Sequence, residues 1–388
     1  MYGVICVLLL SYSLFAGCAT GAGLLMICGT AAEGCDPFIM LAGPWLGAQL
    51  MGWFHGRGLW EQASVVLWIS LVSMSYASTW IEVWVWLEVS AICLYMLLPV
   101  SVAIPYFILS SCGTLSLAVG LMLWYPAAGL DLVTYNVMGA GMAGVLIWVG
   151  FSFKLYVWPS AYWVASVLEN SGPIVAWWFS LWGGAIALIG IDRVSTSGVF
   201  TDGYTASWVW MTVCVGWIVA CFAAWASGGV WSIVGHGAYV HMGWLVSLIV
   251  LGESKLWSTY LIWYWVVLWM LGSFIIANSG SNGMGVGVRY MWAGVVLVFV
   301  WSAWIGVPIA WMGLWVKLWL SINLFSSGVS TWVIGLVAGW GMLFSYVRGI
   351  RLAYFEGYSD ASGIRPWSSG GAFILVASLM TVGCAALI

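Results

Sequence analysis

Apolar runs long enough to cross a membrane alternate with short clusters of glycine, serine, aspartate or proline along the whole chain. A transmembrane helix needs about 20 predominantly apolar residues. The pattern therefore predicts an all-α polytopic membrane protein with about 13 transmembrane helices (range about 11–14). The runs lie near residues 4–28, 38–54, 62–79, 80–99, 101–124, 135–168, 173–191, 206–227, 230–251, 257–278, 290–325, 329–350 and 370–388.

Two of these runs are too long for one straight helix, and each contains a proline close to a lysine. Pro159 follows Lys154 in the first run, and Pro308 precedes Lys317 in the second. Proline breaks or kinks a helix, and broken helices in membranes are tolerated where the backbone lines a cavity or packs on protein. Discontinuous helices at matching positions are typical of inverted repeats in transporters. Coincidence is the alternative, because proline is common in transmembrane helices.

The same pattern predicts one membrane domain, 1–388, organised around two halves. We expect N-terminal helices at 1–79, a first half at 80–227, a second half at 228–354, and a C-terminal loop and helix at 355–388. The first run lacks a basic N-terminal region and a small-residue cleavage site, so we expect Tyr2–Cys28 to be a retained helix.

The composition excludes several classes of protein. Of the 388 residues, 64% are hydrophobic and only 5% are charged, against about 25% charged in a soluble domain. No basic patch occurs that would indicate nucleic acid binding. The nine cysteines are scattered and do not cluster with histidine, so neither a metal site nor a disulfide framework is predicted. We expect the 33 tryptophans to form lipid-facing or packing surface.

The two lysines are the most unusual residues of this chain. Lys154 is the only charged residue between Asp131 and Glu169, and Lys317 is the only one between Arg289 and Arg348. A lysine at mid-bilayer costs about 2.5–3.5 kcal/mol on insertion scales, and intramembrane charges mark ion or proton pathways. The two positions therefore indicate ion or proton movement.

Two further ionisable residues lie inside apolar runs. Glu88 lies near the middle of its run and is the natural counter-charge of Lys154, so we predict an intramembrane ion pair. The pair is either a proton-loading site or a static structural contact. His241 is a candidate proton relay, or a packing residue held by a hydrogen bond. His236 precedes it by five residues, which is not the spacing of a metal-ligand pair on one helix face.

These polar residues occur in segments that resemble one family, NADH dehydrogenase subunit 2, the antiporter-like subunit of respiratory complex I. The matching segments follow the family's order over residues 80 to about 354. They are Trp86-Leu-Glu-Val-Ser-Ala, Ala103-Ile-Pro-Tyr-Phe, Phe153-Lys-Leu-Tyr-Val-Trp-Pro, Ala238-Tyr-Val-His-Met-Gly-Trp, Gly306-Val-Pro-Ile-Ala-Trp-Met-Gly-Leu-Trp-Val-Lys and Arg351-Leu-Ala-Tyr.

The resemblance implies a proton-translocating subunit of NADH:ubiquinone reductase. Glu88 and Lys154 would form the coupling pair, Lys317 the distal proton site, and His241 an additional relay group. The resemblance implies no redox chemistry, bound cofactor or metal in this chain, with FMN, iron–sulfur clusters and ubiquinone in other subunits. Implied partners are other membrane-arm subunits, including the neighbouring antiporter-like subunit 4, and phospholipids such as cardiolipin. The expected location is the mitochondrial inner membrane.

One departure from the family pattern bears directly on function. The helix after the broken one normally carries a central lysine, and here the expected position falls near Gly184-Ala185 in an uncharged run. Two alternatives therefore stay open beside the first reading. One is a structural membrane-arm subunit whose proton path has decayed, and the other is a subunit of an Mrp-type sodium/proton antiporter. A hydrated path from Lys154 to Lys317 would favour pumping, and a dry, tryptophan-filled gap near Gly184 would favour decay.

Overall fold

The structure is a computed structural model that describes part of the chain. The described residues are 59–128, 141–158, 162–195, 197–200, 203–253 and 329–355, with single positions at 257, 260–261, 264, 268, 317–318, 321–322 and 325.

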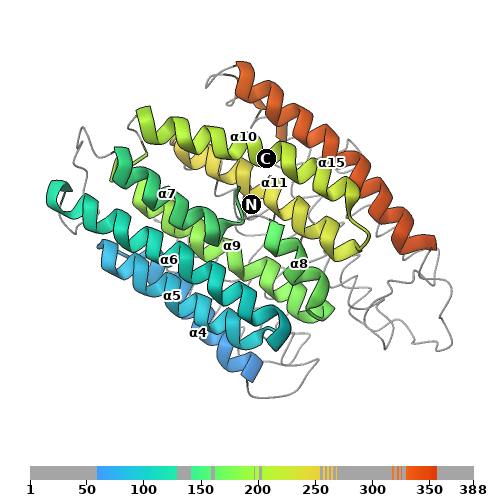
Figure 1. Cartoon of the computed structure of the whole chain (residues 1–388), viewed down its shortest axis with the longest axis horizontal. Helices are drawn as coiled ribbons and strands as arrows, with labels where there is room; N and C mark the ends of the chain where they lie inside the picture. The colour runs from blue at the N-terminus through green and yellow to red at the C-terminus, as the bar shows by residue number, and fades with distance from the viewer. Residues whose placement is uncertain are drawn as a thin grey trace, which may run out of the picture.

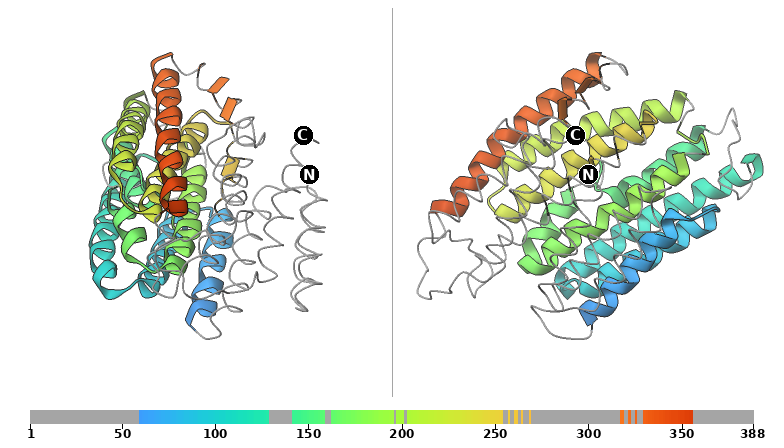
Figure 2. Two further views of the ribbon diagram at one scale, coloured as in Figure 1. Left: turned by 90° about the vertical axis from the view of Figure 1, so that its right-hand side faces the viewer. Right: turned by 180° about the vertical axis from the view of Figure 1, so that it is seen from behind.

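Nine helices lie within these ranges, and they run side by side in one bundle (Figure 1). Helices α4, α5 and α6 form one edge, α10 and α15 lie towards the opposite edge, and the view from behind agrees (Figure 2). The helices are α4 (Leu59–Ser75), α5 (Trp80–Leu97), α6 (Val100–Ala128), α7 (Gly141–Leu155), α8 (Tyr162–Asn170), α9 (Pro173–Ser195), α10 (Gly203–Ala226), α11 (Val230–Val250) and α15 (Val329–Phe355).

Five of the described helices are long and apolar enough to cross a membrane. Their burial divides them into two groups. Within the membrane-length windows, 94% of the residues of α11 and 83% of those of α9 are buried, against 28% in α6. A helix that is apolar on all sides belongs in the interior of a protein or membrane bundle. Helices α9 and α11 are therefore the central elements, and α6 presents much of its surface to the surroundings.

The predicted runs agree with the observed helices wherever the structure describes them. Runs 62–79, 80–99, 101–124, 173–191, 206–227, 230–251 and 329–350 correspond to α4, α5, α6, α9, α10, α11 and α15. The run at 135–168 is divided into α7 and α8, as its length predicted. Pro159 itself, and the runs at 4–28, 38–54 and 370–388, lie outside the described residues, as do most of 257–278 and 290–325.

A capping box fixes the start of α5. The Thr79 side chain accepts a hydrogen bond from the Glu82 amide, and the Glu82 carboxylate accepts one from the Thr79 amide at 3.1 Å. These bonds satisfy amide groups that have no partner inside the helix. They set the beginning of the helix that carries Glu88 two turns further on.

Many tryptophans lie inside the bundle, where they fill space between helices. Trp148, Trp178, Trp182 and Trp217 are at most 1% exposed. The Trp148 indole N–H donates to the Thr212 hydroxyl at 2.8 Å and joins α7 to α10. The expectation of packing surface is therefore confirmed for these four residues, and lipid contact is excluded for them.

Candidate functional site

The predicted ion pair between Glu88 and Lys154 is present. Glu88 projects from α5, Lys154 lies in the last turn of α7, and the Lys154 Nζ is 2.9 Å from the Glu88 Oε1. The Lys154 side chain is 8% exposed and the Glu88 side chain is 30% exposed. The cation is thus buried against a carboxylate that keeps partial access to the outside of the described bundle.

Two hydroxyls of α6 complete the surroundings of the pair. The Lys154 ammonium donates to the Ser110 Oγ at 2.7 Å, and the Thr114 hydroxyl donates a short hydrogen bond to the Glu88 Oε1. A buried charge is tolerated when it is paired and its remaining hydrogen-bonding capacity is used. Sequence reasoning missed both hydroxyls. Their spacing of four residues, which places them on one face of an apolar helix, was the available signal.

Close packing of α6 on α7 brings these groups together. A Cβ added to Gly113 of α6 would lie 2.7 Å from the Phe153 Cβ, and one added to Gly150 of α7 would lie 2.7 Å from the Leu117 Cβ. Small residues let membrane helices approach closely without a hydrophobic driving force. The short interaxial distance lets the Ser110 side chain reach the lysine.

Helix α7 ends directly after Lys154 in a left-handed turn. Tyr156 has φ 63°, and the Val157 amide donates to the Ser152 carbonyl at 3.1 Å. This bond is the six-residue closure of a Schellman motif, in which the left-handed position is usually glycine. A tyrosine there costs about 1–2 kcal/mol. The break places the negative end of the α7 dipole beside the Lys154 cation, which favours its charged form.

A small cavity adjoins the lysine. Its volume is about 10 Å³, and its lining includes Lys154, Ser110, Tyr106, Tyr156 and Gly183. A polar cavity of roughly this size holds about one water molecule. The cavity lies on the side of the lysine that faces α9.

His241 belongs to a second buried cluster. Its Nδ1 lies 2.6 Å from the Tyr260 hydroxyl, its ring centroid is 5.3 Å from that of Tyr264, and the residue is 1% exposed. Lys317 is close enough to His241 for the two groups to interact electrostatically. The structure therefore groups the predicted residues into two clusters, Glu88 with Lys154 and His241 with Lys317. Sequence reasoning missed Tyr260, which lies in the apolar run 257–278, a run that contains no charged residue.

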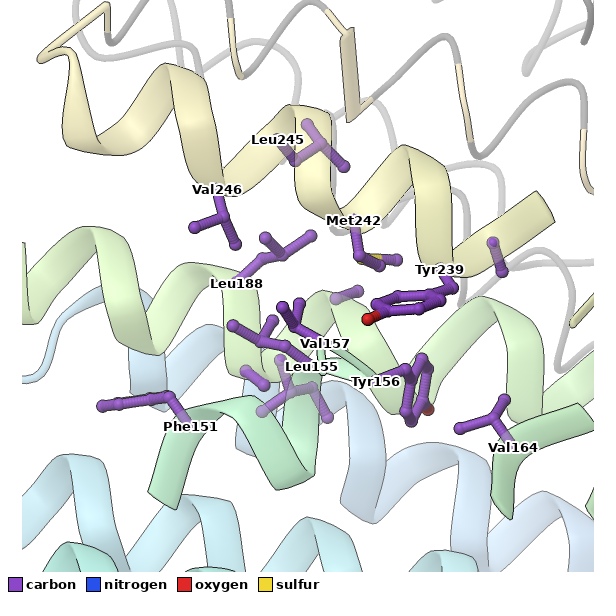
Figure 3. Close-up of a cluster of buried hydrophobic side chains, with 14 of the residues drawn as sticks. Phe151, Leu155, Tyr156, Val157, Val164, Leu188, Tyr239, Met242, Leu245 and Val246 are labelled. Atoms are coloured by element: carbon purple, nitrogen blue, oxygen red, sulfur yellow. The ribbon is translucent and has the colours of Figure 1, made fainter. Parts of the chain in front are cut away.

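The layer between the two clusters is packed by Tyr156 and Met242. A Cβ added to Gly184, near the position expected to carry a lysine, would lie 2.6 Å from the Met242 Cε and 3.4 Å from the Tyr156 Cε2. Figure 3 shows Met242 and Tyr239 of α11 above Tyr156 in this layer. Met242 and Tyr156, and no tryptophan, are thus the side chains nearest to a Cβ at Gly184.

Among the described residues, no group of three or more histidine, cysteine, aspartate or glutamate side chains could hold a metal ion. The Glu88–Lys154 site offers a cation, a carboxylate and hydroxyls. Such a set can hold a proton and pass it on.

No family model matches the chain. A curated relative is NADH-quinone oxidoreductase subunit N of Cutibacterium acnes, which is 24% identical over 375 aligned positions, covering 81% of this chain and 67% of that protein. The resemblance proposed from the sequence motifs is confirmed by this match.

Three solved structures share the fold. A chain of respiratory complex I from Thermus thermophilus with bound aureothin has a TM-score of 0.82 and 18% identity, covering 99% of this chain and 92% of that one. A chain of the archaeal membrane-bound sulfane sulfur reductase has a TM-score of 0.80 at 16% identity, over 98% and 88% of the two chains. A chain of the Mrp complex from Dietzia sp. has a TM-score of 0.74 at 16% identity, over 99% and 89%. The predicted all-α polytopic membrane fold is therefore confirmed, and the three similarities establish the fold alone.

Proposed function

We propose that this chain is a proton-translocating, antiporter-like subunit in the membrane arm of a respiratory NADH:quinone oxidoreductase. The similarity to NADH-quinone oxidoreductase subunit N supports membership of such an oxidoreductase complex. Quinone reduction in other subunits would supply the energy, so the chain itself needs no redox group. Its own task would be to bind, hold and release protons inside the membrane.

The observation that carries this proposal is the buried Glu88–Lys154 pair at 2.9 Å. Burial favours the neutral lysine, whereas Glu88 and the end of α7 favour the charged one. A shift of α5 relative to α7 that lengthens the Nζ–Oε1 distance would remove the attraction and release a proton. Return of the carboxylate would restore the charged lysine. A pair whose partners belong to different helices can thus convert helix movement into proton transfer.

The second cluster is the proposed destination of the proton. His241 can accept and donate a proton through its two ring nitrogens, and Tyr260 holds one of them at 2.6 Å. Lys317 is close enough to this histidine to interact with it electrostatically, and it would be the distal proton site. In this scheme a proton passes from the Glu88–Lys154 pair across α9 to the α11 cluster.

The partners and location follow from the same proposal. We infer contacts with a neighbouring antiporter-like subunit 4 and with phospholipids such as cardiolipin, in the mitochondrial inner membrane. The curated relative is bacterial, so a bacterial plasma membrane is the alternative location. Purification of the intact assembly and mass spectrometry of its subunits would test the proposal. Flavin- and iron–sulfur-binding partners are expected, whereas an assembly composed only of antiporter subunits would replace the proposal with the Mrp-type alternative.

The decayed-path alternative is supported by the packed layer around Gly184. Lys154→Met distinguishes it from an active path, because methionine keeps the length of the side chain and removes the proton-binding group. If the path is active, Lys154→Met should lower the ratio of protons translocated to electrons transferred relative to the unmodified protein, while the complex still assembles. If the ratio equals that of the unmodified protein, the decayed-path alternative holds.

A further inference from the structure

We propose that Tyr156 is the relay group that carries protons from Lys154 to the His241 cluster, a role that no ionisable residue of α9 fills. This inference rests on the proposed function. Between residues 173 and 191 the sequence of α9 contains no charged residue and no histidine. A proton that crosses this helix therefore needs a group supplied by a neighbouring element.

The backbone at the α7 break holds the Tyr156 side chain in a fixed direction. The left-handed φ of 63° and the bond from the Val157 amide to the Ser152 carbonyl turn the chain away from the helix axis. Non-glycine residues held in this region of backbone conformation concentrate at functional sites. Trp163 and Phe179 pack on the ring, with centroids at 5.6 and 5.8 Å.

The hydroxyl of Tyr156 reaches into the body of α9. A Cβ added to Gly183 would lie 1.5 Å from the Tyr156 hydroxyl oxygen, so this position accepts only glycine while the tyrosine keeps its place. The tyrosine thus places an O–H group at the level of α9 where the helix has no ionisable side chain of its own.

The environment of this hydroxyl indicates a proton-carrying role. Tyr156 is 2% exposed, and its hydroxyl has no hydrogen-bond partner among the described residues. A buried hydroxyl without a partner costs about 1–3 kcal/mol. Tyr156 lines the same cavity of about 10 Å³ as Lys154 and Ser110. One water molecule bound there would satisfy the hydroxyl and connect it to the lysine.

The far side of Tyr156 faces the second cluster. The Tyr264 ring belongs to this cluster, with its centroid 5.3 Å from that of His241. Tyr156 meets Met242, the residue directly after His241, at Gly184. The proposed order of groups from one cluster to the other is thus Lys154, cavity water, Tyr156 and His241.

Proton transfer along this order leaves every intermediate group unchanged. The Lys154 ammonium gives a proton to the cavity water, which passes one of its own to the Tyr156 oxygen. Tyr156 releases its original hydroxyl proton to the second cluster, where the His241 imidazole accepts it. Lysine ends neutral, histidine ends protonated, and the water and the Tyr156 phenol end as they began. No oxidant or reductant is consumed.

The test compares Tyr156→Phe with Tyr239→Phe in the intact assembly, reconstituted in vesicles. Both changes remove one hydroxyl from a tyrosine that is 2% exposed. The Tyr239 hydroxyl faces Gly216 of α10, and this residue does not line the cavity. A positioned proton-transfer group contributes about 10²–10⁴-fold. We therefore expect Tyr156→Phe to lower the proton-transfer rate of this subunit about 100-fold, and Tyr239→Phe to leave it unchanged.

A Lys154→Met arm separates failure of the relay from failure of the proposed function. If Lys154→Met lowers the ratio of protons translocated to electrons transferred and Tyr156→Phe does not, the relay is wrong and the proposed function stands. If neither variant changes the ratio, both are wrong. Equal losses for Tyr156→Phe and Tyr239→Phe would show a packing effect and overturn the relay.

A second measurement does not depend on the redox assay. A cryo-electron microscopy map of the assembly that resolves ordered water is expected to show one water within hydrogen-bonding distance of the Tyr156 oxygen and the Lys154 Nζ. A well-ordered cavity without that density would overturn the relay, even if the variant folds poorly.

Discussion

Replacing Glu88 by glutamine removes the charge beside Lys154 and keeps an oxygen that accepts a hydrogen bond from the ammonium. Two unit charges 2.9 Å apart attract by about 6 kcal/mol at an effective dielectric constant of about 20. Removing one partner of a buried ion pair lowers the stability of a protein by about 3–5 kcal/mol, because the other charge is left buried without compensation. Because the Glu88 side chain is 30% exposed and water screens it, we expect a loss near the low end, about 3 kcal/mol.

This loss acts on the balance between charged and neutral lysine. Without the Glu88 charge, the cost of burying the Lys154 ammonium is no longer offset by a carboxylate, so the neutral form of the lysine is favoured. A lysine that rarely binds a proton rarely passes one on. We therefore expect Glu88→Gln to lower proton transfer through this subunit by about two orders of magnitude, while the assembly still forms.

The assay follows the quenching of a fluorescent pH dye in vesicles and divides proton uptake by the rate of electron transfer. Glu82→Gln is the matched control, because Glu82 lies on the same helix and glutamine can replace glutamate in a capping box. The control should keep the ratio of the unmodified protein. If Glu88→Gln behaves like Glu82→Gln, the pair is a static contact and the coupling role of Glu88 is refuted.

Three further predictions concern the surroundings of the pair and the packing that holds it. Ser110→Ala should lower proton transfer, since it removes the 2.7 Å contact to the lysine, whereas Ser116→Ala on the same helix should not; equal effects would contradict a role for the first hydroxyl. Thr212→Val should destabilise the fold by about 1–3 kcal/mol in a thermal melt, because the buried Trp148 N–H loses its acceptor; an unchanged melting temperature would exclude this bond as a stabilising contact. Gly150→Ala should lower the yield of assembled complex, because overpacking costs about 1–3 kcal/mol, and an unchanged yield would show that α6 and α7 can separate without loss.

The position of the ion pair could be predicted before the fold was known. A lysine inside a membrane run needs a counter-charge, and Glu88 is the only carboxylate near the middle of a described apolar helix. The division of the run at 135–168 also followed from length alone, because one straight helix cannot contain it inside a bilayer. These conclusions depend on the cost of burying charge and on membrane thickness, which act on any sequence alike.

The contacts around the pair depended on which helices pack together. Ser110 and Thr114 reach the pair because α6 and α7 approach closely at small residues, and nothing local in the sequence fixes that approach. The left-handed conformation of Tyr156 was likewise unpredictable, since this position usually selects glycine.

Hydropathy alone determined that the chain forms membrane helices, roughly where along the sequence they lie, and which charges they must bury. The tertiary structure alone decided that Tyr156 reaches Gly183, that Tyr260 holds His241, and that tryptophans such as Trp182 lie inside. The physical reason is that the two kinds of property depend on different separations along the chain. Burial cost and helix length are properties of short segments, whereas a hydroxyl finds its neighbour only after distant segments pack side by side.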